Sequence, residues 1–345
     1  MVQPGGSSAD SVERIRHLLQ LDRNAQALEA AGATLATYPD DPDVLAFASI
    51  AARRLGRLDE ALTFAERAVA AGPDDDAAHG VLAAAQLAAG HVEEATRTAY
   101  RAVQLRPDHW FHHVRYAECL MAHPRGRETA WLAAQRAVEL APGEATAHHM
   151  IADVAYGKGM GTPEQLVIAE AALREALRLS PDDAGLRNDL ARVRLARSDS
   201  AGALSGFSDA VVTDPTGVGA VALRNLRLVL RRVVFIQALV VLAGVYVSSG
   251  LAGKSPSIGG RLAVVVLALA LTGFIVWRWR KLLGGASARV VIAQVFRGAR
   301  RLTAAVTSVA LAVAVMILGV FLPGEGPSSA MGAALLLSLV ALLCV

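Results

Sequence analysis

The chain has 345 residues, of which 54% are hydrophobic and only 19% are charged. A soluble domain is nearer to about a quarter charged, so this composition argues against an ordinary soluble protein and indicates contact with lipid. The formal charge of +3 hides an asymmetry. Residues 1–215 carry 21 Lys and Arg against 30 Asp and Glu, whereas residues 216–345 carry 13 against one acid, Glu325. The chain therefore has an acidic first part and a basic, apolar second part.

The cysteines and the N-terminus bear on the cellular compartment. Cys119 and Cys344 are too few for a disulfide framework and too far apart for a metal or redox pair. Residues 1–9 are expected to be flexible. The N-terminal residues lack the basic segment followed by an apolar segment that marks a cleaved secretory signal. We therefore expect the first part of the chain to stay in the cytosol.

A repeat of about 34 residues runs through the first part. Prolines recur at intervals of 34, 34, 35, 39 and 34 residues, at Pro39, Pro73, Pro107, Pro142, Pro181 and Pro215. The segments before them align, as in Gly56-RLDEALTFAERAVAAG-Pro73 and Gly90-HVEEATRTAYRAVQLR-Pro107. Pairs of alanines occupy matching positions before these prolines, at Ala61 and Ala68, Ala95 and Ala102, Ala130 and Ala137, Ala169 and Ala176, and Ala203 and Ala210. A period of this length is typical of a solenoid.

This pattern resembles the tetratricopeptide repeat. The resemblance implies six pairs of antiparallel helices over 10–215, in which small residues let the two helices meet and a proline ends the second helix. Extra residues near His123 and Gly157 are expected to lengthen the turn between the helices of their pairs. The predicted fold class is all-α, an α-solenoid followed by a transmembrane helical bundle.

The resemblance also implies a concave groove lined mainly by the first helix of each pair. Carrying the family's groove positions onto this sequence gives a set of mixed charge with aromatic anchors: Arg53, Arg54, Phe111, Glu118, Met121, His149, Asp153, Tyr156 and Arg192. The sequence lacks the Lys and Asn set with which members of the family hold a C-terminal carboxylate. We expect a protein or peptide partner in this groove.

The second part is dominated by long apolar runs. A basic juxtamembrane helix is predicted over 216–232, followed by four membrane spans over 233–253, 262–279, 302–322 and 329–345. Eleven of the thirteen basic residues after Pro215 lie before the first span or between the second and third, so the repeats and the C-terminus are expected to be cytoplasmic. The abundance of alanine and arginine favours a bacterial plasma membrane.

Residues 288–301 form an amphipathic segment with two interpretations. Val291, Ile292, Val295 and Phe296 fall on one face, and Gln294, Arg297, Arg300 and Arg301 on the other. The segment either lies at the headgroup surface and attracts anionic lipid, or simply extends the third span into the cytoplasm.

Catalytic and metal-binding motifs do not stand out. The sequence contains no GxxxxGK[ST], HExxH or GxSxG pattern. His79, His113 and His148 occupy the same repeat position, which favours packing or surface histidines over a metal site, and no cofactor is expected. The soluble part is net acidic, so nucleic acid is not expected as a partner.

These observations favour a non-enzymatic scaffold, a cytosolic repeat groove tethered to the bilayer. The alternative is an assembly or regulatory subunit of a membrane complex, whose spans pack against those of its partners. A homo-oligomer through small-residue helix faces is a further option. A channel or transporter component is less favoured, because the predicted spans contain no ionisable side chain.

Overall fold

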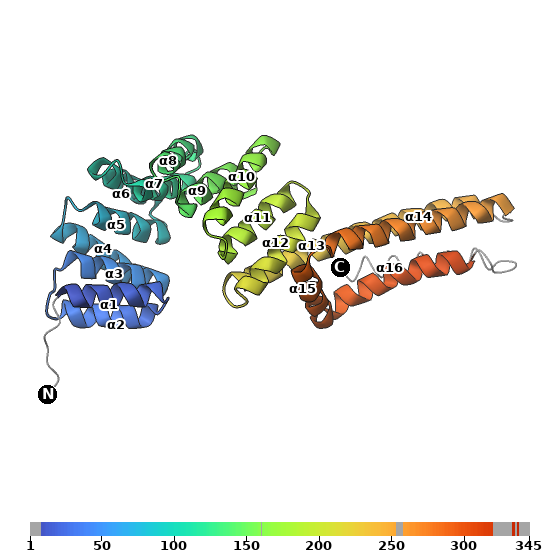
Figure 1. Ribbon diagram of the computed structural model, residues 1–345, viewed down its shortest axis with the longest axis horizontal. Helices are drawn as coiled ribbons and strands as arrows, with labels where there is room; N and C mark the ends of the chain where they lie inside the picture. Colours follow the sequence, from blue (N-terminus) through green and yellow to red (C-terminus); the bar gives the residue numbers. More distant parts are fainter. Residues whose placement is uncertain (1–7, 160, 253–257, 320–332, 335–336, 338–345) are drawn as a thin grey trace, which may run out of the picture. The chain divides into compact units, whose positions relative to one another are not determined.

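A computed structural model describes residues 8–159, 161–252, 258–319, 333–334 and 337 (Figure 1). Within these residues the chain is all-helical and contains no β-strand. The helices divide into two compact units, residues 1–181 and 182–345. Five predicted helix pairs lie in the first unit, and the sixth pair opens the second.

The first unit consists of ten α-helices that pair in chain order. They are α1 (Ser8–Gln20), α2 (Asn24–Leu35), α3 (Pro42–Arg54), α4 (Leu58–Ala71), α5 (Asp76–Ala88), α6 (Val92–Leu105), α7 (Trp110–Ala122), α8 (Arg127–Leu140), α9 (Ala145–Tyr156) and α10 (Pro163–Leu179), with a 3₁₀ turn over Gly157–Gly159. The longer turns expected near His123 and Gly157 lie between α7 and α8 and between α9 and α10, as predicted.

The residues after each repeated proline start the first helix of the next pair. Asp41 accepts a hydrogen bond from the Val44 amide at 3.1 Å, and Asp75 accepts one from the Ala77 amide at 2.9 Å. Such caps satisfy amides that have no partner within the helix. The turns inside the second and third pairs each contain a left-handed glycine, Gly56 (φ 76°) and Gly90 (φ 87°).

The predicted small residues form the contact between the helices of each pair. All ten alanines singled out in the sequence have no exposed surface. Ala61 and Ala65 on α4, for example, pack with Ala52 on α3 and with Leu82 on α5. A methyl group in place of a longer side chain brings the helix axes close together, so the prediction from the repeat pattern is confirmed.

The three histidines at the same repeat position perform the same task. His79, His113 and His148 each place Nε2 at 2.8–2.9 Å from the carbonyl oxygen of the proline six residues earlier. Each ring thereby ties the first turn of a first helix to the loop before it. Their recurrence thus has a structural cause within the repeat.

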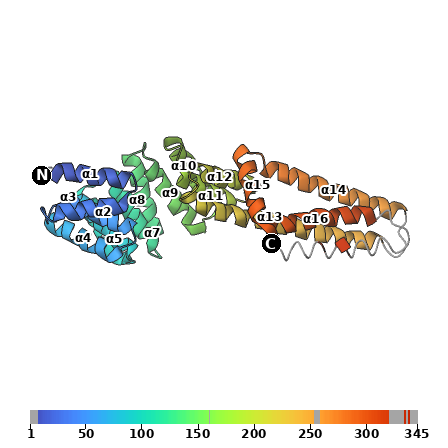
Figure 2. The ribbon, with the colours of Figure 1, turned by 90° about the horizontal axis from the view of Figure 1, so that it is seen from below.

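The second unit begins with the sixth pair and continues into longer helices. They are α11 (Ala184–Ala196), α12 (Ser200–Thr213), α13 (Val218–Ala252), α14 (Ile258–Leu282), α15 (Ala286–Gly298) and α16 (Arg300–Gly319). Figure 2 shows α13, α14 and α16 alongside one another. The segments predicted as a juxtamembrane helix and a first span form one helix, α13, over their described residues.

One hydrophobic core joins the sixth pair to the helices that follow it. Leu204 and Phe207 of α12 are fully buried against Leu226 and Leu230 of α13 and Ile292 of α15. Leu302 and Ala305 of α16 complete this core. A terminal repeat exposes an apolar face unless another element caps it, and here α13 and α15 provide that cap.

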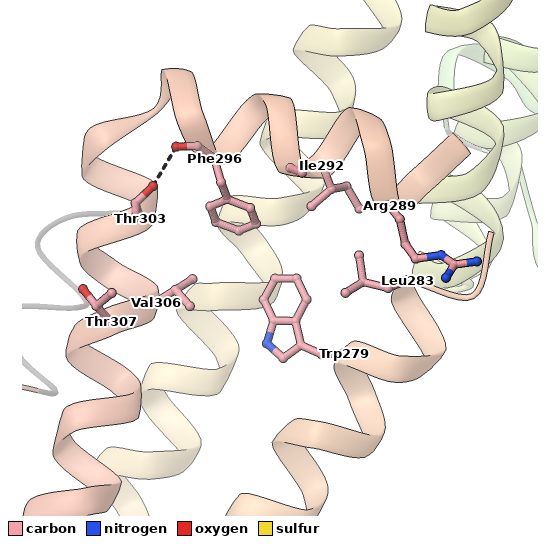
Figure 3. Close-up of a pocket in the computed structure, with 9 residues that line it drawn as sticks. Trp279, Leu283, Arg289, Ile292, Phe296, Thr303, Val306 and Thr307 are labelled. Atoms are coloured by element: carbon pink, nitrogen blue, oxygen red, sulfur yellow. Dashed lines mark hydrogen bonds between the residues drawn. The ribbon is translucent and has the colours of Figure 1, made fainter. Parts of the chain in front are cut away.

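Residues 288–298 of the predicted amphipathic segment lie in helix α15, whose apolar face is largely buried within the protein. The prediction of one helix over 288–301 is wrong at its end, because Arg300 and Arg301 belong to α16, beyond a bend of 102°, so α15 is not a straight extension of the third predicted span. Val291, Ile292 and Val295 are each 3% exposed in the core with α12 and α13, whereas Arg289, Gln294 and Arg297 are exposed. Phe296 lies beside Trp279 of α14, with ring centroids 6.0 Å apart (Figure 3). Most of the face proposed for lipid contact is therefore engaged in the fold.

Among the described residues, one helix is long and apolar enough to cross a membrane. It spans Leu262–Leu282, within α14, and covers the predicted second span. The bent pair Ala286–Arg297 and Arg300–Val315 passes the same test only if the two are counted together, with a bend of 102° between them. A four-span bundle is not shown. Most of the predicted last span, 329–345, lies outside the described residues.

We predict that Ala65→Leu destabilises the first unit by about 1–3 kcal/mol, because its added atoms have no space between α3, α4 and α5. The matched control is Ala70→Leu on the exposed face of the same helix, expected to change stability by no more than about 0.5 kcal/mol. Urea unfolding of the full chain, followed by circular dichroism, measures both. Equal losses in the two variants would contradict the close helix contact.

Candidate functional site

The predicted groove residues that the structure brings together lie on three first helices of the first unit. We call this group the first-helix cluster. It consists of Arg53 on α3, Phe111, Arg115 and Glu118 on α7, and His149 and Asp153 on α9. Five of these six residues were predicted from the repeat positions.

An ion pair between Arg115 and Glu118 lies at the centre of the cluster. The Arg115 guanidinium donates to Glu118 Oε2 one turn further along α7. The side chains are only 16% and 35% exposed, so their charges are partly removed from water. This partial burial strengthens electrostatic contacts beyond those of a fully exposed pair.

The charges around Glu118 come from all three helices. Burial raises the pKa of Glu118, and Asp153 raises it further, while Arg115, Arg53 and His149 lower it. The net result is a pKa above the ordinary value for glutamate. Glu118 is therefore incompletely compensated and would gain from an additional positive charge nearby.

Arg53 experiences the opposite imbalance. Burial lowers its pKa, and the neighbouring guanidiniums of Arg115 and Arg54 lower it further, while Glu118 raises it. The half-buried guanidinium remains protonated at neutral pH because arginine starts from a very high pKa. Arg53 thus lies partly buried beside two other guanidiniums and one carboxylate.

Phe111 adds an exposed aromatic surface to these charges. Its ring is 36% exposed, and the Arg115 guanidinium carbon lies 5.3 Å from the ring centroid. Trp110 packs against it edge to face, with ring centroids 5.4 Å apart. The ring is held in place by two neighbours while one side stays open to a ligand.

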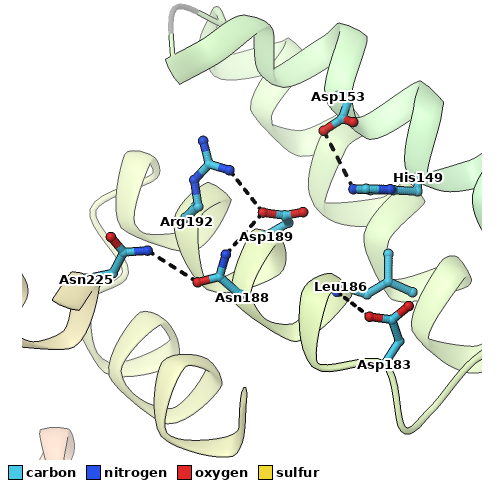
Figure 4. A network of polar contacts seen from close by, with 8 residues as sticks. All are labelled: His149, Asp153, Asp183, Leu186, Asn188, Asp189, Arg192 and Asn225. Atoms are coloured by element: carbon cyan, nitrogen blue, oxygen red, sulfur yellow. Dashed lines mark hydrogen bonds and ion pairs between the residues drawn. The ribbon is translucent and has the colours of Figure 1, made fainter. Parts of the chain in front are cut away.

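On α9, His149 and Asp153 form a contact one helical turn apart, with Nε2 and Oδ1 separated by 3.7 Å (Figure 4). Their side chains are 31% and 50% exposed. Both also act on the pKa of Glu118, which places α9 beside α7 in the cluster.

Other predicted groove residues have different surroundings. Arg54 donates to the Leu19 carbonyl oxygen at 2.8 Å and thereby ties α3 to the end of α1. Met121 packs against the core of α7, α8 and α9, and Tyr156 is half-buried at the end of α9. Arg192 belongs to the second unit, where it pairs with Asp189 at 3.0 Å.

The residue that sequence reasoning missed is Arg115. Its signal was present, because Phe111 precedes it by four residues and Glu118 follows it by three, spacings that place side chains on one helix face. The repeat positions carried over from the family do not include it. A scan of charge spacing along 110–122 would have identified it.

Polar contacts in the second unit hold α11 against its neighbours. Asn225 of α13 donates to Asn188 Oδ1 at 3.2 Å (Figure 4). Arg187 donates to the Thr213 hydroxyl at the end of α12. Ser287 of α15 donates to Asp209 of α12. These contacts orient the helices of the unit and do not form a catalytic arrangement.

Cys119 neighbours the cluster in sequence but not in chemistry. The thiol is fully buried, and burial raises its pKa to about 12. The thiol is therefore protonated at neutral pH, whereas the thiolate is the reactive form of cysteine.

A buried polar pair connects α5 to α7. His112 Nε2 lies 2.6 Å from Asp76 Oδ2, and Arg106 donates to the other carboxylate oxygen at 2.8 Å. Burial lowers the pKa of His112 despite the hydrogen bond with Asp76, so the ring is neutral at pH 7 and donates through Nε2. Its Nδ1 is buried with no hydrogen-bond partner among the described residues, so a proton there would be unsatisfied.

Comparisons with known proteins agree with the fold of the first part. The tetratricopeptide repeat model matches residues 12–76 and 168–218, and the chain carries repeats of this type. No curated protein matches the sequence significantly.

Solved structures show the same fold at low sequence identity. A chain of the APC/C hetero-tetramer Cut9–Hcn1 is 14% identical with a TM-score of 0.55, and the match covers 65% of this chain but only 43% of that one. PilW, a widely conserved type IV pilus biogenesis factor, is 13% identical with a TM-score of 0.50, covering 61% and 94%. Pseudomonas aeruginosa pilF is 14% identical with a TM-score of 0.47, covering 61% and 94%. At identities this low, the matches to the Cut9–Hcn1 chain and to PilW establish the α-solenoid alone.

We predict that acidification weakens the α5–α7 contact in two steps. Burial lowers the pKa of His112 in the folded state. The contribution of His112 to stability is therefore fully present above the pKa of histidine in the unfolded chain, about 6.5, and falls as the pH drops toward the pKa in the folded state. The pKa of Asp76 is also lowered, because the hydrogen bond from His112 and the charge of Arg106 outweigh its burial; its contribution is lost only in more acidic solution.

Hydrogen exchange of α5 and α7 amides, corrected for intrinsic rates, measures this effect. The slope from His112 is at most about 1.4 kcal/mol per pH unit. His112→Gln retains a donor but not the titration, so it should abolish the first step. Helices α3 and α4 contain no histidine and serve as an internal control. An unchanged slope in the variant would assign the effect to another group.

Proposed function

We propose that the chain is a protein-interaction scaffold whose first-helix cluster binds a protein or peptide partner, and whose C-terminal helices hold it at a bacterial plasma membrane. The repeats and the C-terminus would then lie in the cytoplasm. The observation that carries the proposal is the first-helix cluster itself, in which an exposed aromatic ring lies among partly buried charges of both signs.

Each part of the cluster supports a separate role in recognition. Phe111 offers apolar contact area at low entropic cost, because Trp110 and Arg115 already hold its ring in place. Glu118 and Asp153 favour a basic partner group, and Arg53 favours an acidic one. Charges of both signs set the register of an extended segment and discriminate between partners more than they raise affinity.

The remaining predicted groove residues extend this proposal along the first unit. Met121 and Tyr156 are half-buried and would line the floor of the proposed groove, where they would contribute shape more than charge. Arg54 would act by supporting α3 through its bond to Leu19. Arg192, which lies in the second unit, is proposed as a separate partner contact.

The scaffold proposal predicts cross-links from the cluster to a discrete partner in living cells. A photoreactive phenylalanine analogue in place of Phe111 should give a few protein adducts. Arg53→Gln combined with Glu118→Gln should reduce their yield about tenfold or more, because two charge-assisted contacts are lost.

The matched control for this experiment is Leu132 of α8, which is 61% exposed on a second helix. The same analogue at that position should give no discrete adduct. Adducts from Leu132 with none from Phe111 would move the binding surface away from the first helices.

The second unit supports membrane anchoring. Helix Leu262–Leu282 leaves most of its apolar side chains unburied by protein, with Leu262, Val266 and Leu269 each at least 60% exposed. Such surface needs lipid or another apolar partner. Its last turns carry Trp277 and Trp279 with Arg278, Arg280 and Lys281, a composition typical of a membrane boundary. We propose four spans, at 233–253, 262–279, 302–322 and 329–345.

This topology predicts the accessibility of introduced cysteines in a Cys119→Ser, Cys344→Ser background. In intact spheroplasts, a membrane-impermeant maleimide should label Ser255→Cys, in the predicted external loop. It should leave Gln294→Cys, on the exposed face of α15, unlabelled until lysis. Labelling of both positions before lysis, or of neither, would contradict the proposed crossing.

A second candidate function is an assembly or regulatory arm of a membrane complex. The continuous core from α12 through α13 to α16 favours it, because movement of the C-terminal helices would be transmitted directly to the sixth helix pair. The cross-linking residue placed at Val266 separates the candidates. Adducts with another membrane protein favour the complex, whereas lipid adducts favour the simple anchor.

A further inference from the structure

A cavity of about 440 Å³ opens between α14, α15 and α16 in the second unit (Figure 3). Its walls are mainly apolar, with Trp279 on α14, Ile292 and Phe296 on α15, and Val306 on α16. The volume falls in the range of about 300–1,000 Å³ that is typical of small-molecule sites. The core of the unit leaves this space unfilled.

A second, cationic hollow adjoins the apolar one. Both are lined by Phe296, Thr303 and Thr307, and the second adds Arg297 and Arg300. Neither arginine forms an ion pair in the part of the chain that the structure describes. The sequence from Thr216 to Gly324 contains no acidic residue that would neutralise them.

Two further features favour an anion at this hollow. Arg300 is the first residue of the 20-residue helix α16, and the N-terminal end of a helix carries partial positive charge. The cavity also lies beside the aromatic and basic end of α14, the helix that would cross the membrane. An aromatic and basic helix end of this kind lies at the depth of lipid headgroups.

We propose that this double cavity is a binding site for an anionic phospholipid. One acyl chain lies between Trp279, Phe296 and Val306, and the headgroup phosphate is held by Arg297 and Arg300. The charge complementarity selects an anionic headgroup, and the adjoining apolar space selects a lipid over a free phosphate. The inference rests on the membrane location proposed above and adds a specific lipid site to it.

Trp279 lines the cavity and therefore reports on its occupant. Trp277 is 59% exposed and does not line it, so it reports on surrounding lipid. We would prepare full-length chains that retain only one of these tryptophans, with phenylalanine at the other three tryptophan positions. Each would be reconstituted in phosphatidylcholine nanodiscs containing a small fraction of brominated phosphatidylglycerol or brominated phosphatidylcholine.

We expect the brominated anionic lipid to quench Trp279 selectively, whereas Trp277 is quenched equally by both lipids. Arg297→Gln with Arg300→Gln should lower the selectivity at Trp279 about tenfold, because two guanidinium contacts to phosphate are lost. Arg297→Lys with Arg300→Lys should retain part of the selectivity at Trp279, because lysine keeps the charge but not the planar guanidinium. The matched control is Arg224→Gln with Arg227→Gln, two exposed arginines of α13 that do not line the cavity, and it should retain the full selectivity.

Three results would overturn the site. Equal quenching of Trp279 by both lipids would show that the cavity has no headgroup preference. If Trp277 were still quenched in that experiment, the proposed membrane location would stand without the lipid site. If inorganic phosphate abolished the quenching of Trp279 by the brominated anionic lipid, the site would bind phosphate without requiring an acyl chain. No quenching of Trp277 by either lipid would contradict the membrane location, and the lipid site with it.

Discussion

Each helix pair of this chain has an apolar face that it cannot bury by itself, and the covering of that face organises the whole structure. Within the first unit the next pair provides the cover, through fully buried alanines that bring the helices close together. The apolar face of the sixth pair is covered in a different way. Leu204 and Phe207 are covered by α13, α15 and α16, so the last repeat and the apolar helices share one core. The repeats and the C-terminal helices are therefore not separable at Pro215, since a chain cut there would expose that core to water.

The same stacking determines which charges meet. First helices of successive pairs lie beside one another, so charged residues one or two repeats apart act on the same group. Glu118 is influenced by Arg53 on α3 and by Asp153 on α9, although no two of these residues are close in sequence. Partial burial makes these interactions stronger than those on an open surface. An array built of nearly identical pairs can thus carry an individual binding surface, because the scaffold positions remain alanine while the exposed first-helix positions are free to differ.

Sequence reasoning predicted the features that depend on periodicity. The six pairs, the buried alanines and the longer turns near His123 and Gly157 all follow from a repeat that is visible in the sequence. It was less successful where two segments far apart meet. An amphipathic helix was predicted over 288–301, but the helix ends at Gly298, and its apolar face is buried by α12 and α13, a pairing that no periodicity encodes. Arg115 was missed for a related reason, because it matches no family groove position and is recognised only by its contacts with Phe111 and Glu118.

The basic residues after Pro215 have two different roles in the proposed function. Arginines at the ends of apolar helices orient a chain in a bilayer through their charge alone, and that task does not require a defined geometry. Arg289 lines the apolar cavity, and the turn between α15 and α16 brings Arg297 and Arg300 to the hollow that adjoins it, so these arginines have a defined geometry. The apolar face of α15 holds that turn in place by packing against the sixth repeat pair, and the bond from Ser287 to Asp209 adds to this contact. A ligand bound at the turn would therefore act on the same core that caps the repeats, so lipid composition and the state of the last repeat would be linked thermodynamically.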